Sequence, residues 1–181
     1  VLGDANNCPS GVGTTVNMSS AENVIIGFTC NGIGTKSTPI SIKADGDIIN
    51  TQAGNSSDYI RIASIANILY WKCGAQGGNC TISSNNKLND VLLFTNGSQE
   101  ITLDGMSTIK NLAVNAEVSS DSVKSITNNM YIKGGYDYSV NMPGITDIGG
   151  DLYIGDNGIA GLSSLHTIGG DLSMLPYSRL T

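Results

Sequence analysis

The sequence is poor in charge, and above all in basic residues. Asp, Glu, Lys and Arg make up 13% of its 181 residues, and Lys and Arg together number nine. These nine are scattered, whereas a nucleic-acid partner would need a basic patch. The net charge of −6 and the isoelectric point near 4.4 also argue against nucleic acid. Disorder is not expected, because it combines low hydrophobicity with a higher net charge.

Long apolar segments are missing too, so no part of the chain is expected to span a membrane. The sequence begins Val1-Leu2-Gly3, without Met. This start predicts a processed mature chain or an excised fragment, with any signal peptide already removed.

Groups that carry catalysis are scarce. His166 is the only histidine and lies inside a repeat, where a structural role is expected. No G-x-S-x-G nucleophile motif is present. Gly149-Gly150 precedes an expected strand rather than a helix, which argues against a phosphate-binding loop.

Carboxylates leave one enzymatic alternative open. Asp45 and Asp47 are close in sequence, and Asp137, Asp147 and Asp151 are candidates for a cluster. Such pairs could cleave polysaccharide on a β-helix. Lyases of that architecture usually add Arg or Lys at the site, and here the only Arg residues are at 61 and 179. We therefore expect no enzyme, with a polysaccharide lyase or hydrolase as the alternative.

What the sequence does contain is a repeat. Asn or Asp followed by an apolar-x-apolar triplet occurs eight times, at intervals of 24, 20, 23, 21, 18, 22 and 20 residues. Four residues cannot bury a face alone, but stacked copies can. The sequence therefore predicts an all-β fold, a parallel β-helix (β-solenoid) of about eight coils of about 21 residues. The copies begin at Asn23, Asp47, Asn67, Asp90, Asn111, Asn129, Asp151 and Asp171.

Alternation along a strand predicts which side chains share a face. The inward pairs are expected at Val24/Ile26, Ile68/Tyr70, Val91/Leu93, Leu112/Val114, Met130/Ile132, Leu152/Ile154 and Leu172/Met174, with Asn50 as the polar exception. The outward positions are apolar or aromatic almost throughout, which predicts an interface unless the chain's own loops cover them. These positions are Ile25, Ile49, Leu69, Leu92, Ala113, Tyr131, Tyr153 and Ser173.

A second series of extended segments keeps the same period and starts roughly six to ten residues ahead of each Asn or Asp. Each coil is therefore expected to hold at least two strands joined by a corner. The segments are 16–18, 40–42, 60–62, 81–83, 101–103, 123–126, 145–148 and 165–168.

The Asn/Asp column has a structural explanation, because these side chains bond nearby backbone groups and can form ladders when stacked. A calcium column is the alternative, but it needs six or more oxygens. We expect no metal and no cofactor.

Residues 1–14 are expected to form an N-terminal cap and residues 15–181 a single solenoid domain. Loops are expected at 50–58, 73–80 and 133–144, where Tyr136 and Tyr138 could grip a partner. Only seven residues, 175–181, follow the last copy. The expectation is that the coils continue in a longer parent or stack on another subunit through an open edge.

Four cysteines, an even number, favour disulfides in a chain of secreted appearance. Cys73 with Cys80 and Cys8 with Cys30 are the expected pairs, whereas a zinc site would need C-x₂₋₄-C spacing that neither pair has. Four N-x-[ST] sequons, at Asn17, Asn55, Asn79 and Asn96, are candidate glycosylation sites. These features predict an extracellular or cell-surface location.

Residues 144–174 contain two copies of the pattern L-x-x-L-x-x-I-G-G-D-L-x-I or close variants, around Ile148-Gly149-Gly150-Asp151 and Ile168-Gly169-Gly170-Asp171. This stretch resembles the L-domain-like leucine-rich repeats of receptor ectodomains, fungal cell-wall proteins and bacterial surface proteins. The resemblance implies a right-handed coil, an extracellular binding or structural role, and no catalytic residues. Upstream of about residue 110 the pattern is lost, and a more generic β-helix is expected there.

The function expected from the sequence is therefore that of a secreted, non-enzymatic cell-surface protein with an adhesive or structural role. The alternatives are a subunit of an extracellular filament or pilus, and a polysaccharide-binding or polysaccharide-cleaving β-helix. The expected partner is a protein or a cell-surface glycan. The candidate binding residues are Leu69, Leu92, Tyr131, Tyr136, Tyr138 and Tyr153.

Overall fold

The computed structural model describes residues 17–20, 22–26, 34–51, 57–74, 78–95, 97, 99–135 and 138–181. This part of the chain holds twenty strands and no helix, which confirms the all-β class. Across these residues we find no helix that could serve as a membrane span. The expected N-terminal cap, residues 1–14, lies outside the described residues.

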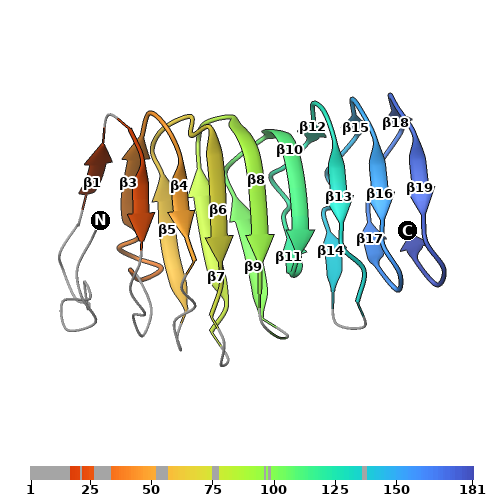
Figure 1. The fold of residues 1–181 in the computed structure, drawn as a ribbon, viewed down its shortest axis with the longest axis horizontal. Helices are drawn as coiled ribbons and strands as arrows, with labels where there is room; N and C mark the ends of the chain where they lie inside the picture. Colours follow the sequence, from red (N-terminus) through yellow and green to blue (C-terminus); the bar gives the residue numbers. More distant parts are fainter. Residues whose placement is uncertain are drawn as a thin grey trace.

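The strands form two parallel sheets that extend along one axis (Figure 1). Sheet I contains β2 (Val24–Ile26), β4 (Ile48–Asn50), β6 (Ile68–Lys72), β8 (Leu88–Phe94), β10 (Thr108–Asn115), β13 (Met130–Ile132), β16 (Leu152–Ile154) and β19 (Leu172–Met174), with the short β12 (Ser125–Ile126), β15 (Asp147–Ile148) and β18 (Thr167–Ile168). Sheet II contains β1 (Asn17–Ser20), β3 (Ile40–Ala44), β5 (Asp58–Ile62), β7 (Cys80–Ser84), β9 (Glu100–Asp104), β11 (Glu117–Ser119), β14 (Ser139–Asn141), β17 (Ile159–Gly161) and β20 (Arg179–Leu180).

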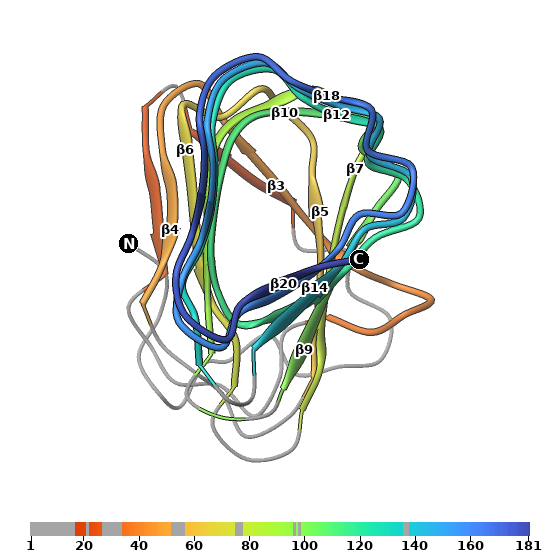
Figure 2. The same ribbon diagram turned by 90° about the vertical axis from the view of Figure 1, so that its right-hand side faces the viewer.

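Viewed along the axis, successive coils follow similar paths around a common interior (Figure 2). The chain is thus a parallel β-solenoid of about seven turns, because eight stacked repeat strands enclose seven full repeats. The right-handed sense of the coil and the relation to L-domains stay predictions.

The core lies between the two sheets and is built from in-register columns. Leu112 pairs with Met130, and Met130 pairs with Leu152, so apolar side chains of successive coils stack on one another. Burying one such side chain contributes about 1.5–3 kcal/mol, and stacking coils add these contributions along the axis. Asn50 is the expected polar exception: it is 1% exposed, and its Nδ2 donates to Lys72 O at 3.3 Å.

The prediction for the third coil is wrong by one residue. Ile48 pairs with Leu69 rather than with Ile68, so Leu69 faces the core at 1% exposure and Tyr70 faces outward. A shift of one residue exchanges the two faces of a strand. The shift places Trp71, which is fully buried, in the interior, and burying so large a side chain favours this register.

The second series of strands is confirmed only in its first half. Segments 40–42, 60–62, 81–83 and 101–103 lie in sheet II, as expected. Segments 123–126, 145–148 and 165–168 instead lead into β12, β15 and β18, which align with the start of β10 in sheet I. Sheet II continues through β11, β14, β17 and β20, which the repeat pattern did not reveal.

Two stacked reverse turns close the last two coils. Gly158 N donates to Gly155 O at 2.9 Å, and Ser178 N donates to Leu175 O at 3.2 Å. The third residue of each turn has a positive φ, 57° at Asn157 and 61° at Tyr177. Asn tolerates this conformation, whereas Tyr is strained in it.

Candidate binding face on sheet I

The Asn/Asp column runs along the start of the sheet I strands. Its side-chain oxygens accept hydrogen bonds mainly from the backbone N–H of the corresponding residue in the next coil. A hydrogen-bond acceptor is all that this role requires, which explains why Asn and Asp alternate in it. Such bonds join Asp47 N to Asn23 Oδ1 (2.7 Å), Asn129 N to Asn111 Oδ1 (3.0 Å), Asp151 N to Asn129 Oδ1 (2.9 Å) and Asp171 N to Asp151 Oδ1 (2.8 Å).

This column also explains the Gly-Gly-Asp motif. A Cβ at Gly150 would overlap Asn129 Oδ1, and a Cβ at Gly170 would overlap Asp151 Oδ1. Glycine before the Asp therefore lets the side-chain oxygen of one coil reach the backbone of the next. The third coil departs from the pattern, because its shifted register places Ile68 in the column and Asn67 one residue before it.

A second column, the outward column, lies beside the first on the outer surface of sheet I. Side chains on it are half-buried or exposed, and Ile25 and Tyr131 are 43% and 45% exposed. With Tyr70 in place of Leu69, the predicted column is otherwise present. Strand pairing aligns Ile25, Ile49, Tyr70, Leu92, Ala113, Tyr131, Tyr153 and Ser173.

Aromatic rings stack along the outward column. The rings of Tyr131 and Tyr153 have centroids 4.6 Å apart and planes within 3° of each other. Tyr70 of the column also stacks diagonally on Phe94, which lies beside the column two residues beyond Leu92, with centroids 4.9 Å apart at 24°. Offset stacking of this kind contributes about 0.5–1.5 kcal/mol per pair, so the rings are held in place before any partner arrives.

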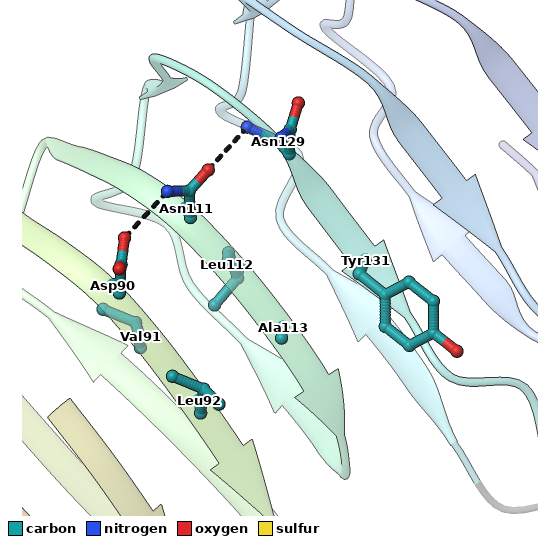
Figure 3. A pocket seen from close by; sticks show the side chains of 8 residues that line it. All are labelled: Asp90, Val91, Leu92, Asn111, Leu112, Ala113, Asn129 and Tyr131. Atoms are coloured by element: carbon teal, nitrogen blue, oxygen red, sulfur yellow. Dashed lines mark hydrogen bonds between the residues drawn. The ribbon is translucent and has the colours of Figure 1, made fainter. Parts of the chain in front are cut away.

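An open hollow of about 240 Å³ interrupts the stack at Ala113 (Figure 3). Leu92 and Tyr131 flank it on the neighbouring strands. Along one margin a chain of hydrogen bonds runs across three coils: Asn111 Nδ2 donates to Asp90 Oδ1 at 2.7 Å, and Asn129 N donates to Asn111 Oδ1. The lining is completed by Val91 and Leu112, which are buried beneath.

The predicted binding residues divide into three groups. Leu92, Tyr131 and Tyr153 come together in the outward column, whereas Leu69 is buried in the core. Tyr138 lies just before β14 of sheet II, against Gly135, and Tyr136 is outside the described residues.

Sequence reasoning missed Tyr70, Phe94 and the polar margin of the hollow. Phe94 continues the alternation two residues beyond Leu92, so following each strand past its triplet would have found it. The hollow itself has no sequence signal except the small side chain of Ala113 between larger residues on the coils either side.

The disulfide Cys73–Cys80 is confirmed, with Cα atoms 6.0 Å apart and both cysteines fully buried. It closes a loop beside Trp71, whose Nε1 donates to Asp58 Oδ2 at 3.4 Å. Cys8 and Cys30 lie outside the described residues.

Of the candidate glycosylation sites, Asn55 and Asn96 lie outside the described residues, and Asn17 begins β1. Asn79 is exposed, but its Oδ1 accepts a hydrogen bond from Glu100 N at 3.2 Å. Glycosylation there would use a side chain that already joins two coils.

Among the carboxylates considered for catalysis, Asp45 and Asp47 lie on either side of Gly46 just before β4, and Asp137 lies outside the described residues. Asp147 Oδ2 accepts a hydrogen bond from Thr146 Oγ1 at 2.6 Å, and Asp151 belongs to the Asn/Asp column. His166 is exposed, with Nδ1 2.5 Å from Ser164 O. Within the described ranges, no three His, Cys, Asp or Glu side chains are grouped as metal ligands.

No protein-family model, curated protein or solved structure matches this chain. The resemblance of residues 144–174 to L-domain-like repeats therefore gains no support from known proteins.

Proposed function

We propose that this chain is a secreted, non-enzymatic cell-surface module whose adhesive or structural role is exercised through the outward column of sheet I. The observation that carries the proposal is that column. It places apolar and aromatic side chains, half-buried or exposed, at positions where a solvent-facing strand would normally be polar.

The rigidity of the face supports a role in binding. Every side chain of the outward column lies on a strand that is paired with its neighbours in sheet I. The aromatic rings on this face form two stacked pairs, Tyr70 with Phe94 and Tyr131 with Tyr153. A face that is ordered before binding loses little conformational entropy when a partner docks. The expected partner is a protein or a glycan of a cell surface.

The extracellular setting is supported by the Cys73–Cys80 disulfide, since such bonds persist mainly in oxidising compartments. A relation to right-handed L-domain-like coils would fit the same role. A polysaccharide-cleaving enzyme is less well supported, because Asp151 already accepts a hydrogen bond that links two coils and no basic side chain lies among the residues that line the hollow of sheet I.

Binding of the labelled protein to intact cells and to immobilised cell-wall and matrix material tests the proposal. We expect saturable binding that is lost in the triple variant Ile25→Glu, Tyr131→Glu, Tyr153→Glu, because buried charge opposes docking. A matched control carries Ser41→Glu, Thr102→Glu and Ser119→Glu on the outer face of sheet II, where two of the positions are also adjacent.

The control variant has the same net charge as the test variant, and it should bind as the parent protein does. Equal loss in both variants would show a general charge effect and contradict the proposal. If the sheet I variant instead changes only the size of a homo-oligomer, measured by light scattering, the face joins copies of this chain, and a filament subunit replaces the adhesive module.

A further inference from the structure

The outward column has a vacancy at Ala113 that matches the spacing of its own ring stack. Tyr131 and Tyr153 stack with centroids 4.6 Å apart, close to the distance of about 4.8 Å between neighbouring strands. A ring on the coil before Tyr131 would continue the stack, but the residue there is Ala113, whose side chain ends at Cβ. Tyr153 stacks on one face of the Tyr131 ring, and on its other side Tyr131 is paired with Ala113, whose methyl group is too short to cover the second face.

The width of the vacancy suits one ring. Leu92 and Tyr131 lie on either side of Ala113, two strand spacings apart, which is about 10 Å. A flat ring in contact with both needs about 7–8 Å, since each van der Waals contact takes about 3.5–4 Å. The hollow of about 240 Å³ is also smaller than the roughly 300–1,000 Å³ of sites for drug-sized molecules.

The margin of the hollow offers an acceptor and a donor. Asp90 Oδ1 accepts from Asn111 Nδ2, and Asn129 Oδ1 accepts from Asp151 N. Within the described residues, no hydrogen bond occupies the second carboxylate oxygen of Asp90 or the side-chain Nδ2 of Asn129. Both residues line the hollow (Figure 3).

An open aromatic face beside such a margin fits a sugar ring. The C–H bonds on one face of a pyranose contact the electron-rich face of a tyrosine, and its hydroxyl groups both donate to a carboxylate and accept from an amide. An inserted Phe or Leu of a protein would fill the apolar part but leave the polar margin without partners. Asp90 is the single charged residue of the lining, so no cation is present there to hold an acidic sugar.

We propose that the hollow at Ala113 binds one uncharged pyranose ring of a cell-surface glycan, stacked on Tyr131 and hydrogen-bonded to Asp90 and Asn129. The inference rests on the proposed function and names the class of partner that the face of sheet I takes.

Isothermal titration calorimetry of the whole chain with maltotriose, cellotriose, mannotriose and triacetylchitotriose, and with sialyllactose as the acidic comparison, tests the inference. At least one neutral trisaccharide should bind, and sialyllactose should not bind more tightly. Ala113→Tyr fills the vacancy and should weaken binding at least about tenfold. Ala113→Ser leaves the space open and should keep the affinity within about twofold.

Tyr131→Leu removes the aromatic face while keeping an apolar side chain, and should also weaken binding about tenfold. This variant decides the question if Ala113→Tyr loses its β-sheet circular dichroism. Binding of no trisaccharide, or equal binding by Ala113→Tyr and Ala113→Ser, would overturn the inference.

The two proposals fail in distinguishable ways. If cell binding is lost in the triple-Glu variant of sheet I but kept in Ala113→Tyr, the face docks a partner without using the hollow, and only the sugar site is refuted. If the parent protein binds no surface at all, the proposed function is refuted together with the sugar site.

Discussion

At the scale of single residues, one side-chain oxygen per coil links most neighbouring coils along sheet I. Asn111, Asn129 and Asp151 each accept, on a side-chain oxygen, a hydrogen bond from a backbone N–H of the next coil. The bond is local in space but connects residues about 20 positions apart in sequence. It therefore adds to the backbone pairing that holds the start of each strand in register.

Removing one of these oxygens should weaken the stack measurably. We expect Asp151→Ala to lower the free energy of unfolding by about 0.5–1.5 kcal/mol, the usual net contribution of a hydrogen bond. Asp151→Asn keeps an acceptor and should stay close to the parent. Urea unfolding followed by circular dichroism measures both values.

Asp156→Ala is the control. Asp156 is exposed, and within the described residues its carboxylate makes no hydrogen bond. Its effect should stay within about 0.5 kcal/mol. Equal destabilisation by Asp151→Ala and Asp156→Ala would mean that loss of charge, not of the acceptor, is responsible.

The strained tyrosine in the last coil provides a second prediction. Tyr177 has φ of 61° and is 82% exposed, so its ring contributes little packing. Tyr177→Gly should raise the free energy of unfolding by about 0.5–1 kcal/mol, because Gly avoids most of the left-handed penalty while gaining freedom in the unfolded chain. Tyr177→Val should lower it, since β-branched residues are least suited to positive φ. A higher midpoint for Val than for Gly in thermal unfolding would contradict this account.

The Asn/Asp repeat and its role in backbone bonding were predictable from the sequence, because the residue type and period are explicit in it. The partner of each hydrogen bond was not predictable. Whether Asn129 bonds the amide or the backbone of a neighbouring coil depends on the distance between strands and on the absence of a Cβ at Gly150, which only the folded stack defines.

At the scale of strands, β6 shows where pattern reading fails. Residues 68–71 are all apolar or aromatic, so the pairs Ile68/Tyr70 and Leu69/Trp71 satisfy the alternation equally well. The choice between them depends on the volume available in the core, and the structure buries Trp71. The missed strands β11, β14 and β17 are only three residues long, and their buried pairs Ala116/Val118, Val140/Met142 and Ala160/Leu162 differ in size and extend past the strand ends, which weakens the repeat signal.

The loop between β6 and β7 is the element most dependent on a covalent bond. The double variant Cys73→Ala, Cys80→Ala leaves Cys8 and Cys30 intact and opens a loop of sequence separation 7. We expect a loss of about 2–3 kcal/mol from the greater entropy of the unfolded chain. The urea midpoint should fall at unchanged slope.

The same variant should brighten the emission of Trp71, the only tryptophan of the chain, because a neighbouring disulfide quenches an excited indole. The emission maximum should stay blue-shifted, since Trp71 remains buried. An unchanged intensity together with an unchanged midpoint would show that the bond does not constrain this region.

At the scale of the whole molecule, coils contact mainly their neighbours in the stack, so stability is expected to be a sum over coils and their interfaces. The existence of the solenoid could be predicted from the sequence for this reason: one short repeat specifies a local interface, and stacking it specifies the fold. The hollow at Ala113 could not, because it depends on the relative size of side chains from three different coils.

Deleting one complete coil should therefore be tolerated. Removing residues 130–151 joins Asn129 to Leu152 and lets Leu152 pair with Leu112 in the register that Met130 occupied. We expect β-sheet circular dichroism to persist with a lower unfolding midpoint. Removing residues 130–140 exchanges inward and outward side chains and should unfold the C-terminal coils. Similar spectra for the two deletions would argue against independent coils.

Alternation along the strands of sheet I separates two evolutionary constraints that most binding sites combine. A substitution at Ile25, Leu92 or Ala113 alters the outer surface and leaves the volume of the interior unchanged, because only the residues on either side of it face inward. Related chains can therefore diversify their specificity one position at a time on a constant scaffold. Successive variable positions are one strand spacing apart, about 4.8 Å. A long ligand lying along the axis would therefore meet one variable side chain at each such step.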